Sequence, residues 1–233
     1  MPFVADIETR DESRGPIWGP FAVIRDNVEL LLVLNLGWSL QLLPGVLALA
    51  FPQLPPWLRL AMGVYSATAL IPATGVLYAL TLAAARGEQL SMELAIQSLR
   101  DFALPSFRIL MPLYGVFGVL IWLAIIIGPA MPIVTTLATL ACLLWYLCAT
   151  FWGPLLAAHP DTDVVSVVRG SILLVWRYPA ETLVTALVAA VALVVGTISI
   201  GGLVLIVPVV IALLHTQRYL DLVARDAAAK RGE

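Results

Sequence analysis

The chain has 233 residues, of which 61% are apolar and 12% charged, with 13 Lys and Arg against 15 Asp and Glu. Soluble domains average about 45–50% apolar and about 25% charged residues. This composition excludes a disordered chain, a nucleic-acid-binding protein with a basic surface, and most soluble folds. Two cysteines are too few for a disulfide framework.

Six stretches of the chain are long and apolar enough to cross a membrane as helices. A spanning helix needs about 20 mostly apolar residues, because the hydrocarbon core is about 30 Å thick. Charges are nearly absent from these stretches: only Arg59 lies between Leu30 and Ala85, and only Arg218 lies between Thr182 and Leu220. The sequence therefore predicts an all-α, polytopic membrane protein with six transmembrane helices, over residues 29–51, 58–84, 109–128, 131–157, 180–200 and 202–219.

The basic residues indicate how these helices are oriented. Twelve of the 13 Lys and Arg lie in four segments on one side, and Arg59 alone lies on the other. By the positive-inside rule, both termini are expected in the cytoplasm. We therefore divide the chain into a cytoplasmic N-terminal segment (1–27), a single transmembrane helical domain (28–220) and a cytoplasmic C-terminal tail (221–233).

The first two predicted spans carry uncharged polar side chains. Asn35 and Ser39 lie one helical turn apart, Gln41 follows them, and Thr68 lies on the second span. Hydrogen bonding between helices is the ordinary role of such residues in a membrane. The alternative is that these four residues line a polar pocket for a neutral solute.

A first amphipathic helix is predicted over residues 91–104, on the cytoplasmic side. Its apolar face contains Met92, Leu99 and Phe102, and Pro105 is expected to end it before the third span. Helices of this kind lie in the membrane interface or dock on a partner protein.

A second amphipathic helix is predicted over residues 163–176, with Val168, Ile172 and Trp176 on one face. Asp161 or Thr162 is expected to cap it, and Pro179 to end it. Together with residues 1–27, the two helices suggest three repeats, each an amphipathic helix followed by a hairpin of two spans.

Two kinds of residue are expected near the predicted membrane interfaces: oppositely charged residues in a salt bridge, and aromatic residues. Arg177 lies four residues before Glu181, a spacing that favours a local salt bridge. Trp152, Trp176 and Tyr219 are expected at the cytoplasmic interface, where aromatic residues collect.

Residues with catalytic or metal-binding chemistry are sparse. The sequence contains no nucleotide-binding, hydrolase or zinc-protease motif. His159 and His215 fall at cytoplasmic helix ends, where we expect interfacial residues rather than ligands of a metal or haem. The alternative is an enzyme acting on lipid, in which both histidines would converge with Asp161 and Asp163. We expect no enzymatic activity, no catalytic residue, no cofactor and no bound metal.

Several motifs in residues 27–110 resemble the YesL-like family of bacterial membrane proteins. They are Asn35 to Trp38 (NLGW) with Pro44, the run from Pro72 to Tyr78 (PATGVLY), the charged turn from Arg86 to Glu88, and a short helix containing Phe102. Residues 45–71 separate the two proline motifs, a longer spacing than the family has. The resemblance implies a multi-pass protein of the bacterial cytoplasmic membrane, often associated with sugar-importing ABC transporters and with no established biochemical activity.

These observations leave two main functional hypotheses. The first is a non-enzymatic accessory or assembly subunit that packs against other membrane-protein subunits, linked to a carbohydrate ABC transporter. The alternative is a solute-binding membrane subunit of a transporter. In both, the expected partners are the lipid bilayer and other membrane proteins, and no nucleic acid is expected.

Overall fold

The computed structural model describes residues 28–127, 130–199 and 206–231, and these residues form seven α-helices and no β-strand. All of the helices except the short α6 are long and apolar enough to span a membrane. The prediction of an all-α, polytopic membrane protein is therefore confirmed. In chain order the helices are α2 (Val28–Ala50), α3 (Pro56–Ala85), α4 (Met92–Trp122) with a π-helical turn η1 (Leu123–Ile127), α5 (Pro132–Ala158), α6 (Val164–Arg177), α7 (Pro179–Ser199) and α9 (Val207–Arg231).

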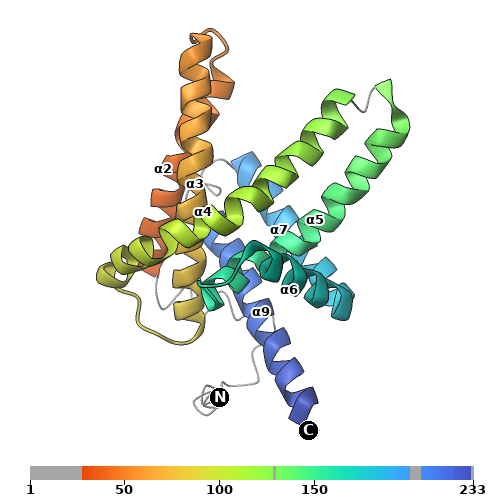
Figure 1. Ribbon diagram of the computed structural model, residues 1–233. Helices are drawn as coiled ribbons and strands as arrows, with labels where there is room; N and C mark the ends of the chain where they lie inside the picture. Colours follow the sequence, from red (N-terminus) through yellow and green to blue (C-terminus); the bar gives the residue numbers. More distant parts are fainter. Residues whose placement is uncertain (1–27, 128–129, 200–205, 232–233) are drawn as a thin grey trace.

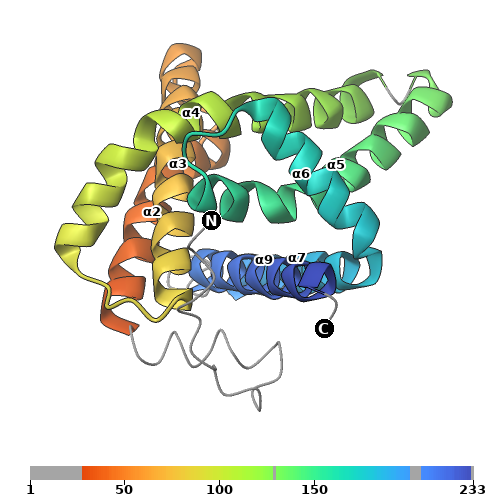
Figure 2. The same cartoon turned by 60° about the horizontal axis from the view of Figure 1, so that its bottom comes forward.

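The long helices form hairpins that meet at a common centre and then diverge. Helices α2 and α3 lie side by side, and α4 crosses α3 before it pairs with α5 (Figure 1). The far ends of these two hairpins point in different directions in both views (Figures 1 and 2). Helix α9 contacts α2, α3, α5 and α7, so it connects the hairpins at the centre.

Burial divides the spans into a central pair and a periphery. Within the most apolar 18 residues of each helix, 61% are buried in α9 and 50% in α3, but only 17% in α2, α4 and α5. The largest apolar cluster joins α2, α3, α5 and α9 through residues such as Leu31, Leu77 and Leu213. The peripheral helices therefore expose most of their apolar side chains, as lipid-facing spans do.

Helix α4 corrects the prediction that Pro105 ends a separate amphipathic helix. The helix runs unbroken from Met92 to Trp122, with Pro105 and Pro112 inside it. Proline removes one backbone hydrogen bond and kinks a helix, but it need not end a helix that packs against its neighbours. The first half of α4, which contains Pro105, is bent (Figure 2).

The helix ends follow the turn and cap residues of the sequence. The Ser91 hydroxyl accepts the Leu94 N–H at the start of α4, and Gly87, with φ of 85°, allows the turn after α3. Asp163, not Asp161 or Thr162, is the N-cap of α6. Asp163 directly precedes Val164, the first residue of α6. Hydrogen bonding from Ser166 lowers the pKa of the Asp163 carboxyl.

The three hairpins differ from one another. Amphipathic segment 92–104 is continuous with its span, whereas α6 is separated from α7 by Tyr178, and residues 1–27 lie outside the described residues. The sixth helix continues past its expected end at residue 219 as far as Arg231. The structure therefore offers no support for three equivalent repeats.

Candidate functional site

The centre of the protein holds an unusual run of polar residues on α9. His215, Thr216, Gln217 and Arg218 follow one another, and all four are buried. Polar and ionisable side chains inside a membrane protein are costly unless neighbouring helices bond them, and they mark functional or structural junctions. We call these four residues the α9 polar segment.

Helix α3 bonds the α9 polar segment through two side chains one turn apart. The Tyr78 hydroxyl lies 2.9 Å from His215 Nδ1, and the hydroxyls of Thr81 and Thr216 are 3.3 Å apart. The rings of Tyr78 and His215 are nearly parallel, at 11°, with centroids 6.3 Å apart. When the phenol donates to Nδ1, the ring proton lies on Nε2. Among the described residues, His215 Nε2 has no hydrogen-bond partner.

Helix α5 approaches this junction closely because Gly153 has no side chain. A Cβ at Gly153 would lie 2.2–2.4 Å from three ring atoms of Tyr78, well inside van der Waals contact. The glycine therefore lets α5 press on the face of the Tyr78 ring and fixes the ring beside His215.

Helix α7 reaches the same segment through Thr185. Arg218 Nε donates to the Thr185 hydroxyl at 3.1 Å, and that hydroxyl in turn donates to the Glu181 carbonyl at 2.8 Å. The guanidinium is thus held in the protein interior by a neutral oxygen on a neighbouring span.

Asn35, predicted to line a pocket, caps α9 from another helix. Its side-chain Oδ1 accepts the Val209 N–H at 3.1 Å. Val209 lies in the first turn of α9, where backbone N–H groups have no partner inside the helix. The amide therefore supplies the bond that an N-cap side chain ordinarily makes.

The other predicted pocket residues bond elsewhere. Gln41 Oε1 accepts the Tyr65 hydroxyl at 2.7 Å, and the Thr68 hydroxyl donates to the Val64 carbonyl at 2.8 Å. Ser39 is buried. Asn35 and Gln41 thus bond to different helices, and a shared solute pocket stays a prediction.

The residues predicted for docking are split between exposed and packed positions. Met92, Leu99, Ile172 and Trp176 are exposed, and Trp176 is the most exposed of them at 86%. The other two, Phe102 and Val168, pack against the apolar cluster that joins α3, α4, α5 and α6.

The ends of α6 and α7 are tied to α9 by charged side chains. Arg177 pairs with Asp226 at 2.8 Å, Glu181 pairs with Arg225 at 3.4 Å, and the Tyr178 hydroxyl donates to Asp226. The predicted local pair of Arg177 with Glu181 is therefore wrong, because α9 passes close enough to offer each a partner. The Asp226 carboxylate, as hydrogen-bond acceptor, raises the pKa of Tyr178.

Two aromatic residues expected at the interface lie in the interior. Trp152 is fully buried, with its ring edge-on to those of Trp145 and Tyr114 at centroid distances of 5.3 and 5.6 Å. Tyr219 is buried against Phe151. Both lie where the hairpins meet, and neighbouring helices cover them there.

The histidines and acids do not form a metal site within the described ranges, where no group of three His, Cys, Asp or Glu side chains converges. His215 bonds to Tyr78 in the interior, whereas His159 and Asp161 are exposed in the loop after α5. What the α9 polar segment does in this structure is to join α3 and α7 to α9 by hydrogen bonds.

Sequence reasoning missed Tyr78, Thr185 and Arg218 as members of this junction. The available indication was the run His215 to Arg218, which interrupts an apolar helix with four polar residues. No protein-family model matches the chain, and no curated protein or solved structure is significantly similar to it.

Proposed function

We propose that the protein is a non-enzymatic accessory or assembly subunit of the bacterial cytoplasmic membrane, with both termini in the cytoplasm. It works by packing against other membrane-protein subunits. The concentration of Lys and Arg in the segments between hairpins supports this orientation. The six apolar spans provide the membrane-embedded part.

The observation that carries this proposal is the uncovered face of α6. Val165, Ile172, Leu173 and Trp176 are all exposed, while Val167 on the opposite face is buried in the protein. Helix α6, with 14 residues, is too short to be one of the spans, so in the proposed orientation it lies at the cytoplasmic boundary of the bilayer, where its apolar face can meet a partner subunit. Exposed apolar residues grouped on one helix face, with a tryptophan among them, are typical of an interface.

The start of α4 offers a second surface of the same kind. Met92, Ile96 and Leu99 follow one another at helical spacing and are exposed. The polar face of the same helix carries Glu93 and Gln97. Two amphipathic segments on one side of the membrane suit a protein that holds a larger assembly together.

The resemblance to the YesL-like family leads us to propose the partner class. We infer that the partner is a membrane subunit of a carbohydrate ABC transporter. A transporter subunit has both the cytoplasmic surface and the spans that the faces of α6 and α4 would contact.

Site-specific photocrosslinking in native membranes tests the proposal. A photoreactive residue placed at Trp176 or Leu99 is expected to form one discrete adduct with another protein subunit. The matched control is Gln97, which is exposed on α4 outside its apolar face. It is expected to form no such adduct.

Crosslinking to lipid alone would contradict the proposal. If Trp176, Leu99 and Gln97 all crosslink only to lipid, and the detergent-extracted protein sediments as a single copy, the faces of α6 and α4 are membrane-facing and the protein has no subunit partner.

A solute-binding membrane subunit is the second candidate, and one observation favours it. Thr150 Oγ1, His215 Nε2 and Gln217 Nε2 are buried polar atoms without a hydrogen-bond partner in the described chain. A bound polar solute would satisfy such atoms. A co-purified small molecule that is lost in the Gln217→Leu variant would support this candidate.

A further inference from the structure

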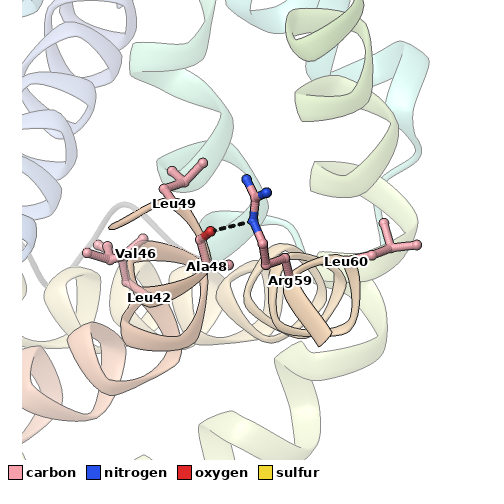
Figure 3. A pocket seen from close by; sticks show the side chains of 8 residues that line it. Leu42, Val46, Ala48, Leu49, Arg59 and Leu60 are labelled. Carbon is pink, nitrogen blue, oxygen red and sulfur yellow. Dashed lines mark hydrogen bonds between the residues drawn. The ribbon is translucent and has the colours of Figure 1, made fainter. Parts of the chain in front are cut away.

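A pocket of about 500 Å³ lies where α2 ends and α3 begins. Its walls are mainly apolar, with Leu42, Val46 and Leu49 from α2 and Leu60 from α3 (Figure 3). The volume falls within the range of about 300–1,000 Å³ that is common for small-molecule sites. None of the functions considered above uses this pocket.

Arg59 is the one charged side chain that lines the pocket. Its Nε donates to the Ala48 carbonyl at 3.0 Å, which satisfies one of the free carbonyls at the end of α2. This bond anchors the guanidinium, and its two terminal nitrogens extend to the same side of the hairpin as Leu49 (Figure 3). Among the described residues, neither terminal nitrogen has a hydrogen-bond partner. An anchored guanidinium of this kind is suited to bidentate recognition of a phosphate.

The position of the pocket restricts what can fill it. Two spans end there, and Leu49 and Trp57 nearby are largely exposed. Tryptophan and arginine at helix ends collect at the boundary between hydrocarbon and headgroups. A soluble anion would not need the apolar walls, and a neutral lipid would not need the arginine.

We propose that this pocket binds an anionic phospholipid, with its phosphate on Arg59 and one acyl chain along the leucine-lined wall of α2. The apolar walls continue into the lipid-facing surface of α2, so a chain from the bilayer enters without leaving hydrocarbon. Arg59 is the only basic residue between Leu30 and Ala85. The pocket therefore contains the one positive charge that this hairpin can offer to an anionic headgroup.

Of the two glycines that line the pocket, only Gly63 can be replaced by a larger residue without a clash. A Cβ at Gly63 would meet no atom within 4 Å, so a larger side chain there fills the pocket without disturbing the helices. A Cβ at Gly45 would lie 3.0 Å from the Ser66 Cβ, and the Gly45 N–H donates to the Ser66 hydroxyl at 2.7 Å. Gly63→Leu is therefore the blocking variant, and Gly45 is left unchanged.

Native mass spectrometry of the full chain tests the assignment, with phosphatidylglycerol and phosphatidylcholine as probes. One phosphatidylglycerol is expected to bind with about fivefold preference over phosphatidylcholine, the size of one arginine–lipid attraction. Arg59→Gln is expected to abolish the preference, and Gly63→Leu to weaken both lipids. Arg100→Gln, at an exposed arginine on α4, is the control and should leave the preference intact.

The outcomes distinguish a lipid headgroup from free inorganic phosphate as the ligand of Arg59. An unchanged preference in Arg59→Gln, or displacement of the bound lipid by inorganic phosphate alone, overturns the assignment. Arg59 also bonds the end of α2, so Arg59→Gln is first checked for folding. If it does not fold, Gly63→Leu decides: undiminished lipid binding in that variant refutes the proposal.

Discussion

Substitution of Gly153 by alanine tests how tightly the central helices meet. The added Cβ would lie 2.2 Å from a ring atom of Tyr78, and carbon atoms in ordinary contact are about 3.5–4.0 Å apart. Either the ring rotates and loses its bond to His215, or α5 and α3 separate by more than about 1 Å. Overpacking costs about 1–3 kcal/mol and the lost hydrogen bond about 1 kcal/mol, while alanine returns about 1 kcal/mol of helix propensity. The net expectation is a loss of about 1–3 kcal/mol.

Unfolding in mixed micelles by titration with SDS, followed by tryptophan fluorescence, measures this loss. Gly118→Ala on α4 is the control, because its Cβ meets no atom within 4 Å and its stability should stay the same or rise. In a Tyr78→Ala background, Gly153→Ala should cost much less, since the clashing ring is gone. Equal stability of Gly153→Ala and Gly118→Ala would refute the packing of Tyr78 against α5.

Three further predictions follow from the buried and charged contacts. Asn35→Ala should lower the free energy of unfolding in SDS by about 1–2 kcal/mol, because Val209 loses its cap, and an unchanged value would contradict this bond. Ser106→Ala should leave stability unchanged or raise it, because the buried Ser106 hydroxyl has no partner among the described residues; a marked loss contradicts this. Tyr178 has a raised pKa, so its bond to Asp226 stabilises the protein below pH 10 and is lost as pH rises through the raised value. Ultraviolet titration of Asp226→Ala should show Tyr178 ionising at lower pH than in the parent, and an unchanged titration curve would show that the bond is absent.

The amino-acid sequence alone determined that six long apolar helices form, because the cost of a charge in hydrocarbon acts on each residue locally. A run of about 20 residues without charge favours a spanning helix, although the bounds of the third and sixth helices differ from those predicted. The same holds for α6, where amphipathic spacing predicted the helix to within one residue at each end. Locally determined features of this kind were confirmed.

Local rules were less reliable where packing competes with them. Pro105 was expected to stop a helix, yet α4 continues through it and bends. The apolar contacts on both sides of the proline outweigh the single backbone bond that it removes. The sequence shows the proline but not the neighbours that hold the helix together.

The tertiary structure alone decided which apolar faces meet protein and which meet lipid. Apolar side chains suit both environments, so the hydropathy of a span does not say which of its faces meets a neighbouring helix. From the sequence, His215 and Arg218 were expected near the cytoplasmic end of their helix. In the structure they lie in the interior, where His215 bonds to Tyr78 and Arg218 to Thr185.

The charged pairs illustrate the same limit. Arg177 and Glu181 have the right spacing on one stretch of chain, but α9 brings Asp226 and Arg225 close to them. A weak local attraction yields to whichever opposite charge the folded chain places nearest, and that distance is set by how the hairpins cross.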